Sequence, residues 1–132
     1  MRTISHQGKA LALIFGPDEN DGSNPLTEQN LGLQIMSLKY KKGHVWPAHR
    51  HVPKERVTRQ LLEANMVMKG AVRIGLYVDG QRVAQEILRA GEGFMVLNHS
   101  TTALEMEVLE NAALFEFKNG PFITDKEFLE QH

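Results

Sequence analysis

The chain of 132 residues has a hydrophobic content of 42%, a charged content of 23% and a formal net charge of -1. This length predicts one domain with its own core, and the near-neutral charge provides no broad field that would attract nucleic acid or an anionic membrane. The chain has no cysteine, which excludes disulfides, thiolate zinc sites and cysteine nucleophiles. No apolar stretch approaches the ~20 residues of a membrane-spanning helix, and no signal-peptide pattern follows the short apolar run 10–15, so we expect a cytoplasmic protein.

In chain order, the pattern predicts short strands separated by turns. The stretch 18–30, rich in Asp, Asn, Gly, Ser and Pro, predicts a loop, and Asp79-Gly80 predicts a hairpin turn. Only the tail, 125–131, predicts a short C-terminal helix. The strands, each an apolar or alternating run bounded by turn residues, are expected over 10–15, 31–40, 61–69, 71–78, 82–88, 94–97, 104–109 and 112–118.

Many short strands with frequent turns favour an all-β sandwich or barrel. A parallel α/β fold is disfavoured, because no amphipathic helix separates the strands. The sequence shows neither an internal repeat nor a linker, so a single domain over 1–132 is the expectation.

Two histidines carry the clearest chemical signal. His49 and His51 are spaced so that an extended chain would place both imidazoles on the same side. Together with the carboxylate of Glu63 they would form a ligand set suited to a divalent transition metal. Two polar residues on a half-exposed strand would give the same pattern, so the hypothesis draws its weight from the flanking Gly43 and Gly70 and from the β-rich setting.

Four segments, spread over about residues 31–125, resemble the motifs of the cupin superfamily. The first two resemble the two halves of the first cupin motif, and the third resembles the turn that opens the second motif. The fourth is similar to the Glu-x-Lys-x-Gly-Pro-aromatic ending of small cupins associated with surface-polysaccharide and sugar-nucleotide pathways. In chain order these segments are Gly43–His51, Glu63–Gly70, Ile87–Gly93 and Glu116–Phe122.

The resemblance implies a double-stranded β-helix, the cupin jelly-roll barrel, with a divalent metal (Fe, Zn, Mn or Ni) in its mouth. Carried over by position, His49 and His51 would be the imidazole ligands and Glu63 the carboxylate ligand. Glu55 is the alternative acid, because it gives a more compact spacing from the two histidines. Glu63 is preferred, because its distance from Gly70 fits the motif and because it lies in a predicted strand.

The second motif lacks the histidine that the family pattern expects. Its position falls at Leu104 or at Thr102, and neither side chain can replace an imidazole. The alternation of Leu104, Met106 and Val108 predicts an apolar inward face instead. His99, in a predicted turn, is the candidate fourth ligand.

The sequence leaves two functions open. The first is a small metal-dependent cupin enzyme, in which the metal polarises a carbonyl or hydroxyl group of a bound small molecule, a sugar derivative on the grounds of the resemblance. The second is a non-catalytic cupin that holds a small ligand or a metal at a degenerate site, which the missing histidine favours. No general base can be named from the sequence.

Partner and substrate contacts follow from the same pattern. Arg56 and Arg59, in the basic insert before Glu63, are candidates for binding an anionic group, although a solvated rim is the slightly favoured interpretation. Asn65 shares the strand parity of Glu63 and is a candidate pocket residue. The resemblance also implies a homodimer, with strand 10–15 or the segment 122–128 as candidate edges.

Overall fold

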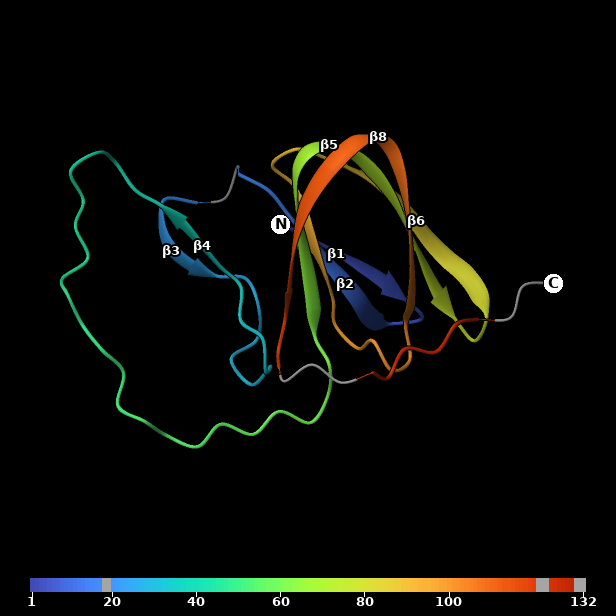
Figure 1. Ribbon diagram of the computed structural model, residues 1–132, viewed down its shortest axis with the longest axis horizontal. Coiled ribbons are helices and arrows are strands. Elements are labelled where there is room, and N and C mark those ends of the chain that lie inside the picture. Colours follow the sequence, from blue (N-terminus) through green and yellow to red (C-terminus); the bar gives the residue numbers. More distant parts are fainter. Residues whose placement is uncertain (18–19, 121–123, 130–132) are drawn as a thin grey trace.

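The computed structural model describes residues 1–17, 20–120 and 124–129, and all regular structure within them is β-strand (Figure 1). A search of these residues finds no helix long and apolar enough to cross a membrane. The strands are β1 (Arg2–His6), β2 (Lys9–Phe15), β3 (Gly22–Pro25), β4 (Met36–Lys39), β5 (Glu63–Val78), β6 (Gln81–Arg89), β7 (Gly93–Val96) and β8 (Ala103–Lys118).

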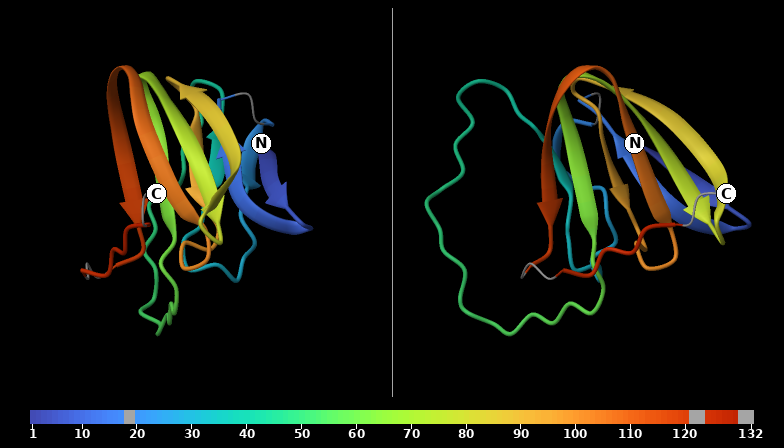
Figure 2. Two further views of the ribbon diagram at one scale, coloured as in Figure 1. Left: turned by 90° about the vertical axis from the view of Figure 1, so that its right-hand side faces the viewer. Right: turned by 45° about the vertical axis from the view of Figure 1, so that its right-hand side comes forward.

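Six strands form one antiparallel sheet in the order β1-β2-β7-β5-β6, with β8 paired to β5. The 16-residue strand β5 changes neighbour along its length: its start pairs with β7 and its later part with β6, while β8 follows it from end to end. Figures 1 and 2 show the consequence, because the β5–β8 pair arches over the molecule and curls the sheet around its inner face. Strands β3 and β4 form a separate two-stranded sheet.

A bulge at Gly70 produces the arch in β5. The β5–β8 register shifts on both sides of this glycine, and its φ of 79° lies in the left-handed region that a side chain disfavours. A Cβ at this position would lie only 2.8 Å from the carbonyl carbon of Asn111. The extra residue also resets the alternation, so that Val67 and Val72 both point into the same core.

The main core lies on the inner face of the curled sheet. Its buried residues are Leu11, Ala12, Ile14, Val67, Val72, Ile74, Leu76, Leu88, Phe94 and Val96. A smaller cluster on the other face joins Leu62, Ala64 and Met95 to the segment 31–35 that covers them. The start of β5 is therefore covered on one face by the main core and on the other by a loop.

The all-β prediction and the Asp79-Gly80 hairpin are confirmed, with both turn residues at positive φ as a tight two-residue hairpin turn requires. Two pairs of predicted strands merge into β5 and β8. The predicted loop 18–30 contains β3, and the predicted strand 31–40 shrinks to β4. The polar strand β3 forms because it pairs with β4, and the local sequence of β3 does not indicate this pairing.

The predicted C-terminal helix, 125–131, is wrong over 125–129, which are irregular in the structure; residues 130 and 131 of that prediction lie outside the described residues. The reason is physical. All the side chains of 124–129 are exposed, and a helix this short is unstable in water unless packing holds an apolar face.

Residues 40–60, here called the arm, form the most unusual segment of the structure. All of them are exposed, none belongs to a strand, and in Figure 1 they run from the end of β4 away from the sheet and back to the start of β5. Structureless connections of this length are uncommon in compact domains and are usually functional loops or linker segments.

Candidate functional site

The strand register gathers polar side chains on the inner face where β5 begins and β8 ends. Glu63 pairs with Lys118, and Asn65 pairs with Glu116. Directly paired residues in an antiparallel sheet project from the same face, so these four side chains lie together. His99, in the turn that follows β7, completes what we call the polar cluster.

Contacts within the polar cluster centre on Glu63. The Nε2 atom of His99 lies 3.4 Å from the Oε2 atom of Glu63, and the two side chains are only 24% and 13% exposed. The Glu63 and Glu116 side chains share a hydrogen bond, and Lys118 Nζ lies 3.5 Å from Glu116 Oε2. A half-buried carboxylate is thus held by an imidazole on one side and a carboxyl group on the other.

The electrostatics follow from these contacts. Hydrogen bonding to His99 lowers the pKa of Glu63 to about 2, against the opposing effect of burial. The same contact raises the pKa of His99 above its usual value. Hydrogen bonding to Glu63, together with burial, raises the pKa of Glu116. Glu63 therefore carries the negative charge, while Glu116 is the carboxyl group that more readily keeps its proton.

Asn65 adds an unsatisfied donor to this face. Its side chain is 3% exposed, and its Nδ2 atom has no hydrogen-bond partner within the described part of the chain. Buried amide donors are rarely left without an acceptor, because the loss of hydration costs about 1–3 kcal/mol. The prediction that Asn65 shares a face with Glu63 agrees with the register, and its role in binding stays a prediction.

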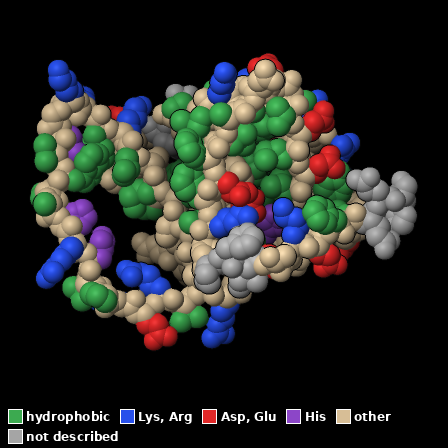
Figure 3. Space-filling model, in the orientation of Figure 1, with side chains coloured by type: hydrophobic (Ala, Val, Ile, Leu, Met, Phe, Trp, Pro, Cys, Tyr) green, Lys and Arg blue, Asp and Glu red, His purple; other side chains and the backbone are tan. Residues whose placement is uncertain are grey.

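The arm carries the two histidines of the predicted metal site. His49 and His51 are exposed and their ring centroids lie 5.4 Å apart, with His49 Nδ1 2.9 Å from the Pro47 carbonyl oxygen. Figure 3 shows histidine side chains on the arm, set apart from the acidic and basic side chains over the sheet. Among the described residues, no group of three His, Asp or Glu side chains is arranged to hold a metal ion. As folded here, His49, His51 and Glu63 do not fit a metal as one site.

The other predicted site residues of the insert also lie on the arm. Glu55, Arg56 and Arg59 are all exposed. The structure thus separates the predicted ligands into two pairs, with Glu63 in contact with His99 on the sheet and His49 beside His51 on the arm.

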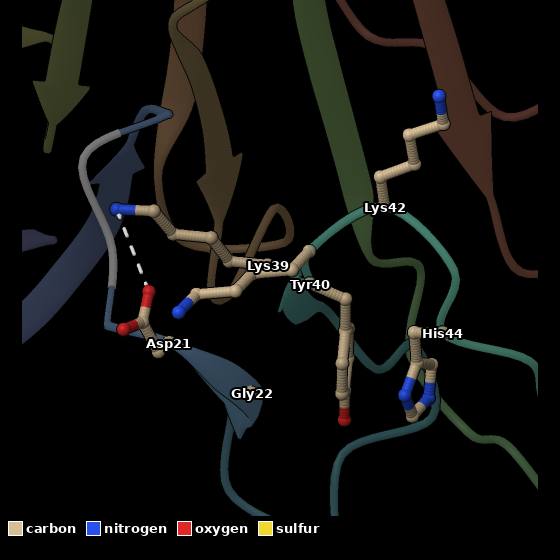
Figure 4. Close-up of a pocket in the computed structure, with 7 residues that line it drawn as sticks. Asp21, Gly22, Lys39, Tyr40, Lys42 and His44 are labelled. Atoms are coloured by element: carbon tan, nitrogen blue, oxygen red, sulfur yellow. Dashed lines mark ion pairs between the residues drawn. The ribbon is translucent and has the colours of Figure 1, made fainter.

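Two open depressions lie elsewhere. One, of about 390 Å³, is lined by the end of β4, the start of the arm and β3. Figure 4 shows Lys39 and Asp21 there, near Tyr40 and His44. The Lys39 Nζ atom lies 3.9 Å from Asp21 Oδ1. The other, of about 360 Å³, is apolar and lies between Phe15, Phe117 and the segment 33–36. Neither is lined by Glu63 or His99, and of the polar cluster only Asn65 lines the second depression.

Sequence reasoning did not place Glu116 and Lys118 in the site. Their alternation along β8 is visible in the sequence, but their closeness to Glu63 depends on a strand pairing between the middle of the chain and its C-terminal part. Comparison of this chain with protein-family models, with curated proteins and with solved structures found no match.

Proposed function

We propose that this protein is a small cupin-type jelly-roll protein that binds one divalent transition metal, Fe, Zn, Mn or Ni, through two half-sites. Glu63 and His99 are the half-site on the sheet, and His49 and His51 are the half-site on the arm. The observation that carries the proposal is the contact of Glu63 with His99, which joins two of the four candidate ligands. Imidazole nitrogen and carboxylate oxygen together suit these metals.

The sheet half-site has the right protonation chemistry for this role. With its pKa near 2, Glu63 is already in the carboxylate form that binds a cation. His99 would have to release its proton to coordinate, so metal and proton would compete for its Nε2 atom. Binding should therefore weaken as the pH falls.

The arm supplies what the sheet half-site lacks. Two donors do not make a stable site for these metals, and closure of the arm would add the two imidazoles of His49 and His51. The arm side chains are exposed throughout, so little buried surface opposes such a movement. Arg56 and Arg59 would move with them, in reach of an anionic group on a ligand.

A metal held by these residues would supply Lewis-acid chemistry to a hydroxyl or carbonyl group of a sugar-type small molecule. In this arrangement, the residues of the chain have separate tasks. The basic side chains of the arm would orient the ligand, and the free amide donor of Asn65 would satisfy one of its oxygen atoms. The apolar core behind the polar cluster would exclude water from one side.

Metal binding can be measured with the chain's own fluorophore. Trp46 is the single tryptophan, and it lies on the arm against Tyr40 and His44. We expect addition of Zn²⁺, Mn²⁺ or Ni²⁺ to the chelator-treated protein to change its fluorescence with one-to-one stoichiometry. The same addition should slow tryptic cleavage within the arm, because closure would protect the basic residues there.

Matched variants separate the half-sites from nonspecific binding. Replacement of Glu63 by Gln, or of both His49 and His51 by Ala, should abolish stoichiometric binding. Replacement of His6, which lies on β1, should leave it intact. A protein that binds no metal at micromolar concentration, or that binds it equally well without His49 and His51, would contradict the proposal.

A non-catalytic protein that binds a small ligand at a degenerate metal site is the second candidate. It is favoured by the contacts that Glu63 already makes, because His99 and Lys118 stabilise its negative charge without a metal. This candidate predicts that simple sugars, titrated in the presence of chelator, shift the NMR signals of Asn65 and His99. The first candidate predicts that such shifts require the metal.

A further inference from the structure

Strand β8 has one edge without a partner. Within the described chain it pairs with β5 alone, from Ala103 to Lys118 with a break in the register around Asn111. A long free edge of this kind is a template for another strand, and natural proteins usually cover or blunt it. Instead, β8 exposes a series of large apolar side chains: Met106, Val108, Leu109, Phe115 and Phe117.

The arm has an extended backbone that could pair with such a strand edge. Over residues 40–60 the backbone joins no sheet, and the exposed side chains include large apolar ones. These are Tyr40, Val45, Trp46, Val52 and Val57. The arm is thus an extended, partly apolar segment whose backbone groups face water, in the same molecule as an apolar strand edge.

The charges of the two surfaces are opposite. The arm bears six basic residues and one acid: Lys41, Lys42, Arg50, Lys54, Arg56 and Arg59, against Glu55. Strand β8 bears four acids and one base: Glu105, Glu107, Glu110 and Glu116, against Lys118. Within the chain, Glu107 and Glu110 contact Arg73 and Arg89 at 3.2 Å and 3.6 Å, but such exposed pairs contribute little and are readily exchanged.

We propose that the arm of one copy of this chain docks along the free edge of β8 in a second copy, and that the second arm docks reciprocally on the first. Backbone hydrogen bonds to the strand edge, apolar contacts and opposite charges would all contribute to the contact. Since every chain has both surfaces, a two-fold dimer satisfies the arm and the edge of both copies at once.

The root of the arm favours a second copy over its own chain. The Leu62 N–H donates to Asn119 Oδ1 at 2.7 Å, and Asn119 Nδ2 donates to the Gln60 carbonyl at 2.9 Å. These bonds hold residues 60–62, directly before β5, at the end of β8. To reach the free edge of its own β8, the arm would have to cross the end of that strand within this clamped stretch. In Figures 1 and 3 it instead runs clear of the sheet.

This dimer contact does not involve a metal. The strand order also excludes one of the two edges expected from the sequence, because strand 10–15 lies between β1 and β7 and is not an edge strand. The segment 122–128 is described only over 124–128. The metal proposal instead closes the arm on Glu63 and His99 of its own chain, so the two positions of the arm are alternatives.

Charge reversal with mixing tests the proposal in chelator, by sedimentation velocity at low salt. One variant carries Arg50→Glu and Lys54→Glu on the arm, and the other carries Glu105→Lys and Glu107→Lys on β8. The unmodified chain should be a dimer, and each variant alone should dimerise more weakly by on the order of 100-fold, because like charges then meet at both contacts. An equimolar mixture should recover a dimer with one copy of each variant, since both of its contacts pair opposite charges.

The recovery in the mixture also shows that both variants are folded. A control with Lys9→Glu, on β2 and away from both surfaces, makes half the charge change of the arm variant, and it should remain dimeric. An unmodified chain that is monomeric at about 100 µM, or an arm variant that dimerises as well as the unmodified chain, overturns the proposal. Failure of the dimer leaves the metal titration of a single chain unaffected, so the two proposals fail separately.

Discussion

Replacement of Gly70 by Ala tests the feature that sets the faces of β5. The bulge at this glycine resets the alternation of the strand, so that Glu63 and Asn65 share the inner face with Val72 despite their different parity. Without the bulge, the polar cluster and the later part of the core would lie on opposite faces. A methyl group at Gly70 should therefore destabilise the fold strongly.

The loss of folding stability in Gly70→Ala has two contributions. The left-handed backbone at φ 79° costs a residue with a Cβ about 1–2 kcal/mol. The new methyl group would also meet backbone atoms that cannot rotate away, since it would lie 2.8 Å from the Asn111 carbonyl carbon and 3.0 Å from the Ala112 Cα atom. Overpacking of this kind costs about 1–3 kcal/mol, for a total of about 3 kcal/mol.

Gly80 is the matched control. Its φ of 76° is nearly the same, but a Cβ there would meet no atom within 4 Å. The Gly80→Ala variant should therefore lose only the backbone contribution, about 1 kcal/mol. Urea denaturation followed by circular dichroism should place the midpoint of Gly70→Ala about 1 M below that of Gly80→Ala. Equal midpoints for the two variants would refute the bulge and the assignment of faces that depends on it.

Two further predictions concern the polar cluster and the root of the arm. In chelator, NMR titration should give a pKa for His99 above its usual value, and Glu63→Gln should lower it. Protonated His99 stabilises the fold through its contact with Glu63. This contribution is complete below about pH 6.5 and is lost as the pH rises through the raised pKa of His99 in the folded protein. The difference in stability between the native chain and Glu63→Gln should therefore be larger at about pH 6 than at about pH 9. Replacement of Asn119 by Ala should cost about 1–2 kcal/mol in urea unfolding and speed tryptic cleavage of the arm, whereas Asn119→Asp keeps the acceptor for Leu62 and should lose less.

Local pattern was sufficient to predict part of the fold. Alternation predicted that Glu63 and Asn65 share one face, and the Asp79-Gly80 pair predicted the hairpin, because both depend on the backbone of a few consecutive residues. The continuity of β5 could not be read in this way. Gly70 breaks the local pattern, and only pairing with β8 shows that the strand continues through it.

The candidate site was predictable to a similar extent. His99 was chosen as a candidate ligand from its place in the chain, but its contact with Glu63 depends on the turn after β7, where Asn98 accepts hydrogen bonds from Ser100 and Thr102. The position of His49 and His51 depends on the arm, which has no internal pattern to determine its path. A sequence motif gives the separation of the ligands along the chain. The distances between their side chains depend on contacts with residues outside the motif.

The arm takes part in both of the proposed contacts. It exposes the histidines that a metal site would need, and it exposes apolar and basic side chains that match the edge of β8. A segment of this composition gains little by remaining in water, because its apolar groups are hydrated and its backbone is ordered by few contacts. The free energy of closing it therefore has to come from a partner, either the second copy on the edge of β8 or the metal at Glu63 and His99. Release of the arm by chelator would indicate that the metal contributes more, whereas release by dilution or by charge reversal would indicate that the second copy contributes more.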